Sequence, residues 1–171
     1  MLVPFIIMAL IDQNYREAFW LTLIAGASDA IDGVIARLFD HKSWLGAYLD
    51  PIADKVLITG LFVTLTVQGA LPLWLVLLAF GRDAAIVVTV AIFRRLKGVP
   101  LRMRPLFISK VNTFVQVGLI VGTLAHLAHV VSFTVEEQYG LVLLAAMTTI
   151  VSWVAYFNEG LRALRQRQPA V

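Results

Sequence analysis

Long apolar stretches alternate with short polar segments along the whole chain. A helix needs about 20 residues to cross the roughly 30 Å of a bilayer's hydrocarbon core, and most of the apolar stretches have that length. They lack the apolar–polar alternation of strands, so the pattern predicts helices. We predict five membrane spans: Ala18–Ile35, Ala47–Val67, Leu73–Phe93, Ser109–Val131 and Tyr139–Phe157.

A sixth apolar stretch, Leu2–Ile11, is too short to cross a bilayer alone. A cleaved signal sequence is the other possible interpretation, but the stretch has no basic start and no small-residue cleavage site. We therefore expect the end of a first span whose beginning precedes Met1. The predicted fold is an all-α polytopic membrane protein with six spans, the first incomplete, in one domain over residues 1–171.

Composition and charge support the membrane class and predict an orientation. Of 171 residues, 60% are hydrophobic and 15% charged, whereas soluble domains are about half apolar and a quarter charged. No cysteine is present, which excludes disulfides and thiolate chemistry. Basic residues gather in the connections 39–46 and 94–105 and in the tail, so the positive-inside rule places these and both termini in the cytoplasm. No nucleic-acid partner is expected.

Four aspartates lie at the cytoplasmic ends of two successive spans. Asp29 and Asp32 are three residues apart, and Asp50 and Asp54 four apart, so each pair shares a helix face. A short connection makes the spans antiparallel neighbours, so all four carboxylates lie at one depth. Membrane carboxylates are costly and usually functional, and oxygen clusters suit Mg²⁺, Mn²⁺ or Ca²⁺. Two bridged ions could hold a diphosphate.

Two other interpretations of these aspartates remain open. They could form ordinary interfacial salt bridges with Arg37, Lys42 and Lys55. The rival functional class is a cation or proton-coupled transporter, in which intramembrane carboxylates line an ion path. That class favours a site near the midplane and charges on several spans, whereas these carboxylates gather toward one side.

Small residues and an arginine accompany the aspartates. Gly33 follows Asp32 directly, and Gly46 precedes Asp50 by one turn, where a helix backbone can approach a neighbour or ligand closely. Ala36 lies one turn beyond Asp32. The guanidinium of Arg37 could clamp a phosphate through two parallel hydrogen bonds.

The pattern Asp29-x2-Asp32-Gly33-x2-Ala36-Arg37-x8-Gly46-x3-Asp50-x3-Asp54 resembles the signature of the CDP-alcohol phosphotransferase family at every fixed position. The resemblance covers essentially the whole chain. It implies six transmembrane helices, a homodimer, and transfer of a phosphatidyl or similar group from a CDP-alcohol to an alcohol acceptor with release of CMP. The weak packing motif Gly118-x3-Gly122 could support the dimer.

The resemblance also implies roles for individual residues. Two Mg²⁺ or Mn²⁺ ions would bind Asp29, Asp32 and Asp50, with Asp54 close to the second ion and acting as the general base on the acceptor hydroxyl. The donor site would be lined by Asp29, Gly33, Ala36, Arg37 and Gly46, with Arg37 on the diphosphate. Asp40 lies outside the motif.

The acceptor is predicted less directly. The stretches Gly81–Val88 and Arg104–Gln116 resemble the branch of this family that makes cardiolipin from phosphatidylglycerol, and next the branch that uses glycerol 3-phosphate. Both acceptors carry a phosphate, for which Arg82 and Lys110 are candidate ligands. The alternatives are structural pairing for Arg82 and snorkelling to headgroups for Lys110. We expect Asp83 to be structural. Because adjacent helical residues do not face each other, we expect Arg82 and Asp83 to have separate partners.

One feature departs from the family pattern. Members usually begin with a Pro-Asn…Thr-x2-Arg stretch at the head of the first span, whereas this sequence starts at Met1-Leu2-Val3-Pro4. We expect either a start codon assigned too late or a fragment. A catalytically impaired homologue that serves as an assembly partner is therefore a further alternative. His126 and His129 lack acidic neighbours in sequence, so no metal role is expected for them.

Overall fold

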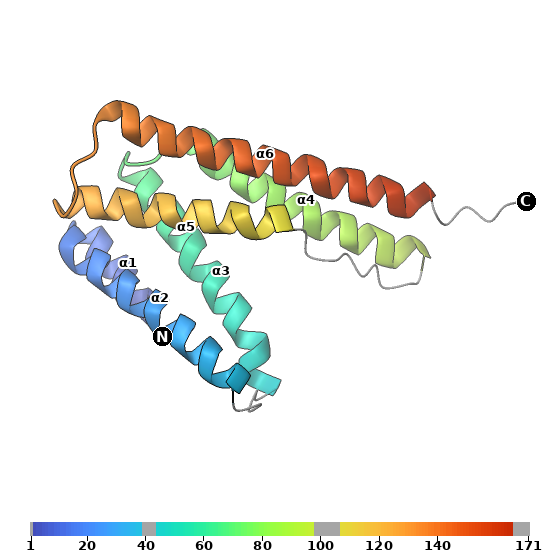
Figure 1. The fold of residues 1–171 in the computed structure, drawn as a ribbon, viewed down its shortest axis with the longest axis horizontal. Helices are drawn as coiled ribbons and strands as arrows, with labels where there is room; N and C mark the ends of the chain where they lie inside the picture. Colours follow the sequence, from blue (N-terminus) through green and yellow to red (C-terminus); the bar gives the residue numbers. More distant parts are fainter. Residues whose placement is uncertain (1, 39–43, 98–106, 166–171) are drawn as a thin grey trace, which may run out of the picture. The chain divides into compact units, whose positions relative to one another are not determined.

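The computed structural model describes residues 2–38, 44–97 and 107–165, with side chains for all of these except 29–30, 32–38, 44–54, 90–97 and 160–165. Within these ranges the chain is helical and contains no strand, which confirms the all-α prediction for this part of the protein (Figure 1). The helices are α1 (Val3–Ile11), α2 (Tyr15–Leu38), α3 (Trp44–Val67), α4 (Leu73–Lys97), α5 (Phe107–Leu127) and α6 (Val135–Arg165).

Four of the five predicted spans lie wholly inside a helix, and the fifth does not. We predicted a span as far as Val131, but α5 ends at Leu127. His129 adopts φ 57°, and the N–H of Val130 bonds back to the Ala125 carbonyl at 2.9 Å, which closes the helix end. The helix therefore ends before the apolar run does, because backbone capping and not hydropathy sets the end of a helix.

The start of α6 also differs from the prediction. We placed residues 132–138 in a connection, but α6 begins at Val135. The Glu137 N–H donates to the Thr134 hydroxyl at 3.2 Å, and the Thr134 N–H donates to the Glu137 carboxylate at 2.8 Å. This reciprocal pair is a capping box, which satisfies two backbone donors at the helix start. The two glutamates of the predicted connection therefore belong to the first turn of α6.

The chain divides into two compact units, which are described separately. Unit 1 comprises residues 1–71 and 117–138, and unit 2 comprises residues 72–116 and 139–171. Helices α1, α2 and α3 belong to unit 1, whereas α4 and most of α6 belong to unit 2. Helix α5 contributes its first half to unit 2 and its second half to unit 1.

In unit 1, α1 packs against both α2 and α3. Its Ile6 and Leu10 side chains are fully buried. Glycine at position 60 allows α3 to approach α1 closely, since a Cβ there would lie 2.9 Å from Cδ1 of Ile7. The Gln68 side chain also donates a hydrogen bond to the Leu10 carbonyl, which joins the C-terminal ends of α3 and α1.

Three helix connections gather at this same end of unit 1. The Gln138 amide donates to the Ala70 carbonyl at 3.2 Å, which joins the start of α6 to the connection after α3. Each connection contains one residue with positive φ: Gln13 at 58°, Gly69 at 76° and His129 at 57°. The segment 39–43, which joins α2 to α3, follows the opposite end of α2.

Among the described residues, two helical segments are long and apolar enough, by length and composition, to cross a membrane: Phe107–Leu127 and Val135–Glu159. Only 28% of the most apolar part of each is buried inside the protein. Large apolar side chains therefore face outward, such as Phe114, which is 80% exposed. Extended apolar surface of this kind is typical of contact with lipid or another protein.

Candidate active site

Both pairs of aspartates lie on helices of unit 1. The backbone of α2 carries positions 29 and 32, and the backbone of α3 carries positions 50 and 54. The helical spacing used in the prediction is therefore present in the fold. The four side chains themselves lie outside the described residues.

The helix bounds add a relation between the two pairs. Asp32 lies six residues before the end of α2 at Leu38, and Asp50 lies six residues after the start of α3 at Trp44. At 1.5 Å per residue both are about 9 Å from the helix ends that segment 39–43 joins. Asp29 and Asp54, nine and ten residues from those ends, lie about 14–15 Å along their helices. The two pairs are thus matched in register about the connection.

The predicted donor-site residues lie on the same two helices. Positions 33, 36 and 37 belong to α2, and position 46 to the first turn of α3. The side chain of Arg37 and the surroundings of Gly33, Ala36 and Gly46 lie outside the described residues. Among the side chains that are described, no group of three or more His, Asp or Glu residues could hold a metal ion. The metal site at the four aspartates stays a prediction.

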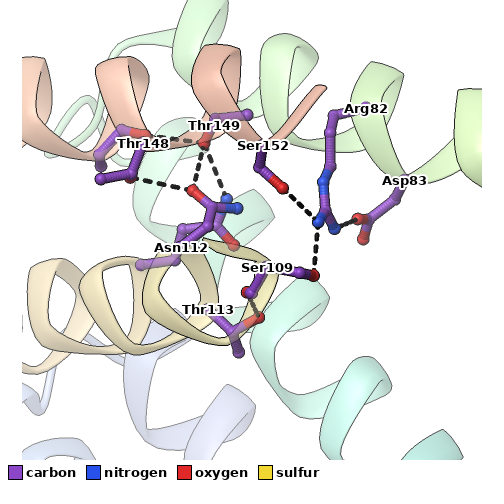
Figure 2. Close-up of polar contacts among 10 residues, drawn as sticks. Arg82, Asp83, Ser109, Asn112, Thr113, Thr148, Thr149 and Ser152 are labelled. Atoms are coloured by element: carbon purple, nitrogen blue, oxygen red, sulfur yellow. Dashed lines mark hydrogen bonds and ion pairs between the residues drawn. The ribbon is translucent and has the colours of Figure 1, made fainter. Parts of the chain in front are cut away.

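Unit 2 contains a buried arginine that bonds to two other helices (Figure 2). Arg82 of α4 is only 7% exposed. Its Nη2 donates to the hydroxyls of Ser109 on α5 and Ser152 on α6, each at 2.6 Å. Its guanidinium also lies 5.3 Å from the ring centre of Tyr156 on α6. One cationic group therefore holds α4, α5 and α6 together.

The remaining contacts of Arg82 correct one expectation. Its Nη1 forms an ion pair with Asp83 at 2.8 Å, although we expected adjacent residues to have separate partners. Adjacent residues point away from different faces of a helix, but the arginine side chain is long enough to place its guanidinium beside the neighbouring carboxylate. In the described part of the protein, Nε of Arg82 is buried without a hydrogen-bond partner.

Lys110 occupies a different environment. It follows Ser109 in the first turns of α5 and is exposed. Its ammonium group is therefore accessible to a ligand or to headgroups, whereas the Arg82 guanidinium is enclosed. Nothing in their geometry tests acceptor binding by either residue, and both stay predictions.

A second polar cluster joins α5 to α6 (Figure 2). The buried Asn112 side chain accepts hydrogen bonds from the hydroxyls of Thr148 at 3.0 Å and Thr149 at 2.8 Å. Gln116 donates to the Thr149 hydroxyl at 3.2 Å. Asn112, Thr113 and Gln116 all belong to the stretch Arg104–Gln116, which carries part of the family resemblance. The hydroxyl of Thr113 instead bonds within α5, to the Ser109 carbonyl at 3.1 Å.

The α6 partners in both clusters were not identified from the sequence. Ser152 and Thr149 are fully buried, and Tyr156 lies one turn beyond Ser152. A signal was present, because polar residues at positions 148, 149, 152 and 156 recur at helical spacing on one face of an apolar stretch. Hydroxyl side chains in membrane helices commonly bond across helices, so this pattern predicts a polar helix contact.

Comparison with known proteins identifies the family. The CDP-alcohol phosphatidyltransferase family matches residues 1–157. The chain belongs to this family. Its members are embedded in the membrane, in agreement with the outward-facing apolar surface of α5 and α6. The resemblance carried by the aspartate motif is therefore confirmed.

Three curated relatives represent the branches of the family that the chain resembles. The chain is 32% identical to the rat cardiolipin synthase (CMP-forming) over 96% of its own length and 59% of the relative's. It is 34% identical to the rice chloroplastic CDP-diacylglycerol–glycerol-3-phosphate 3-phosphatidyltransferase 1, over 90% of the chain and 51% of the relative. It is 33% identical to a probable phosphatidylglycerophosphate synthase of Mycobacterium tuberculosis, over 79% and 61%. The chain thus spans between half and two thirds of these relatives' lengths.

Proposed function

We propose that this chain transfers a phosphatidyl group from CDP-diacylglycerol to the hydroxyl of phosphatidylglycerol, releasing CMP and forming cardiolipin. The observation that carries the proposal is the complete aspartate motif, Asp29 to Asp54, on two successive helices of a chain that belongs to the CDP-alcohol phosphatidyltransferase family. The rat relative, a cardiolipin synthase (CMP-forming), supports this choice of acceptor.

A second acceptor has specific support. The rice and Mycobacterium tuberculosis relatives are named for glycerol 3-phosphate transfer and for phosphatidylglycerophosphate synthesis. Glycerol 3-phosphate is therefore the alternative acceptor, and the reaction would be otherwise unchanged. Both alcohols present a hydroxyl beside a phosphate, so the two reactions need the same donor chemistry.

In the proposed reaction, the acceptor hydroxyl attacks the phosphorus that carries diacylglycerol. The bond from that phosphorus to the bridging diphosphate oxygen breaks, and CMP departs. Asp54 takes the hydroxyl proton, as a nearby carboxylate can. Arg37 contacts the diphosphate through charge-assisted hydrogen bonds. Gly33, Ala36 and Gly46 lack bulk, which allows the nucleotide to approach the two helices.

The donor set suits two divalent ions, Mg²⁺ or Mn²⁺. Asp29, Asp32, Asp50 and Asp54 provide only carboxylate oxygens, which these hard cations prefer. Their matched register about segment 39–43 supports one shared site. When bound, the ions supply stabilisation of the charge that develops on the phosphoryl oxygens.

For the acceptor phosphate we propose Arg82 and Lys110. Exposure of Lys110 supports its availability. In the described part of the protein, Nε of Arg82 has no hydrogen-bond partner, whereas its Nη groups bond to Asp83, Ser109 and Ser152. A phosphate that bound Nη2 would have to displace a serine hydroxyl, and Nε is itself buried, so acceptor binding at Arg82 requires the packing around the guanidinium to open.

The proposed setting is a multi-pass membrane protein with six spans and a single functional domain over residues 1–171. Both termini and the aspartates face the cytoplasm. The connections after α1, α3 and α5 gather at one end of unit 1, whereas segment 39–43 follows the other end of α2. This arrangement supports helices that cross the membrane in alternating directions. We also propose a homodimer. A Cβ added at Gly118 would meet nothing within 4 Å in the described part, which leaves that face of α5 open to a second copy.

The test is an acceptor comparison with purified full-length protein in nanodiscs. CMP release from CDP-diacylglycerol should require Mg²⁺ or Mn²⁺ and stop in excess chelator. Mass spectrometry should detect cardiolipin with phosphatidylglycerol as acceptor. Phosphatidylglycerophosphate formed only with glycerol 3-phosphate would favour the alternative acceptor. Absence of CMP release with either alcohol, together with cation flux in liposomes, would replace the enzyme by a transporter.

A further inference from the structure

A cleft lies at the end of unit 1 remote from the motif aspartates. Its volume is about 710 Å³. The start of α2 and the connection after α5 line it, with Gln13, Tyr15, Arg16, Trp20, Leu127 and His129 among the lining residues. Arg16 stands in the first turn of α2, and Asp29 follows 13 residues later, which places the two roughly 20 Å apart along the helix. The cleft is therefore separate from the predicted transfer site.

Two backbone positions in this cleft carry side chains at a cost in stability. Gln13 and His129 are the non-glycine residues with positive φ in the described part of the chain, and both line the cleft. Both follow helix ends in the same motif as Gly69, where the positive-φ residue is glycine. Glycine adopts this conformation without strain, whereas other residues do not. Glycine at position 13 or 129 would therefore stabilise the fold, yet the sequence has a side chain at both positions.

Ring contacts and a hydrogen bond brace the segments that line the cleft. The Phe133 N–H donates to Nδ1 of His126 at 3.0 Å, and the two rings stack with centres 6.0 Å apart. These contacts brace the connection that carries His129. On the other wall, the ring of Trp20 meets the buried Phe19 ring edge-on at 5.3 Å. The site is therefore largely formed before any ligand arrives, as ligand sites usually are.

The charges near the cleft define its ligand. Arg16 is exposed and forms no ion pair within the described part of the protein, so its guanidinium is available to a phosphate. Two exposed carboxylates border the cleft: Asp12 precedes the lining residue Gln13, and Glu17 accepts a hydrogen bond from the lining residue Asn14 at 2.7 Å. Such carboxylates repel a purely anionic ligand and attract a cationic group. A ligand with both a phosphate and an ammonium group satisfies the two requirements.

The apolar side of the cleft points to a membrane lipid. Leu127, which lines it, is also the last residue of a helix long and apolar enough to cross a membrane. Trp20 is 52% exposed, and tryptophan and tyrosine favour the boundary between hydrocarbon and headgroups. Their rings can also contact an ammonium group. We propose that this cleft binds the headgroup of a zwitterionic phospholipid, with its phosphate on Arg16 and its ammonium group toward the aromatic and acidic side.

The test measures lipid contact at Trp20 itself. Full-length protein with Trp44, Trp74 and Trp153 replaced by phenylalanine is titrated in uncharged detergent with acyl-brominated phosphatidylethanolamine, phosphatidylcholine or phosphatidylglycerol. The zwitterionic lipids should quench Trp20 fluorescence saturably, at concentrations about fivefold lower than phosphatidylglycerol. Equal or stronger quenching by phosphatidylglycerol overturns the proposal.

Matched variants separate direct pairing from surface charge. Arg16→Gln and Ser132→Glu each make the net charge more negative by one, and Ser132 is exposed and does not line the cleft. Arg16→Gln should raise the half-saturating lipid concentration about five- to tenfold, and Ser132→Glu should leave it unchanged. The same shift in both variants contradicts the assignment. Full displacement of the lipid by millimolar inorganic phosphate also contradicts it, because a soluble ligand would then suffice.

Glycine substitutions supply a test that does not depend on Arg16. His129→Gly and Gln13→Gly should each raise the melting temperature by about 2–4 °C through relief of backbone strain. Each should also weaken quenching by phosphatidylethanolamine at least threefold. If a glycine variant is more stable but binds the lipid with the affinity of the parent protein, the replaced side chain does not contact the lipid, and its part in the site is overturned.

Discussion

Arg82 and Ser152 lie seventy positions apart in the sequence and are joined by a hydrogen bond of 2.6 Å. The same nitrogen of Arg82 bonds to Ser109 at 2.6 Å. A single buried cation thus connects three helices of unit 2. A buried charged donor without a partner lowers the stability of the fold, so these two small hydroxyls make a large contribution to the packing of α4, α5 and α6.

The two serines are expected to act together. Ser109→Ala and Ser152→Ala should each lower the free energy of unfolding by about 1–3 kcal/mol, the usual range for a hydrogen bond to a charged group. Because both accept from Nη2, the double variant should lose more than the sum of the single losses. Thermal unfolding in detergent measures all three. Ser132→Ala, at an exposed position, should change stability by less than about 0.5 kcal/mol. Additive losses would show that the hydroxyls do not share Arg82.

Thr148 and Thr149 offer a matched comparison in the second cluster. Thr149 is fully buried and bonds to both Asn112 and Gln116, whereas Thr148 is partly buried and reaches only Asn112 among these two. Thr149→Val, which keeps the shape and removes the hydroxyl, should cost about 1–2 kcal/mol. Thr148→Val should cost less than half of that. The cluster would be energetically unimportant if the two valine variants melted at the same temperature as the parent.

Gly60 is expected to tolerate bulk poorly. A Cβ there would lie 2.9 Å from the end of the Ile7 side chain, whereas a Cβ at Gly26 would meet nothing within 4 Å. Gly60→Leu should therefore destabilise the protein by about 1–3 kcal/mol through overpacking between α1 and α3. Gly26→Leu should be neutral or stabilising, because leucine favours helix over glycine. Ile7→Ala should partly rescue Gly60→Leu. Equal stability of the two leucine variants would contradict the close approach.

Asp54 is the residue on which the proposed chemistry depends most. Asp54→Asn should lower the rate of CMP release by at least about 100-fold, the lower end of what a general base contributes. Binding of the CDP-alcohol should fall much less, since Asp29, Asp32 and Asp50 remain. Rates and nucleotide binding by isothermal titration calorimetry separate the two effects. Asp40→Asn serves as the control, because Asp40 lies outside the motif. Normal turnover by Asp54→Asn would remove it as the base.

Much of the architecture was predictable because it is local. Hydropathy and length located five long helices, and the aspartate motif identified the family. Two of the errors fell at helix ends, where capping contacts decide the boundary. At Thr134 and Glu137 a capping box begins α6 inside a segment that hydropathy assigned to a connection. At His129 a positive φ ends α5 inside an apolar run.

The all-α class, the family and the register of the aspartates were readable from the sequence, because they depend on residue type and on fixed helical periods. The pairing of polar side chains inside the apolar helices, in contrast, became visible only in the folded protein. Arg82 bonds to Ser109 and Ser152, which lie 27 and 70 positions away in the sequence, and Asn112 bonds to Thr149, which lies 37 positions away. No local pattern encodes such partners, since they depend on how helices rotate and pack against one another. The cleft at Arg16 and His129 has the same origin, because it exists only where two distant connections meet.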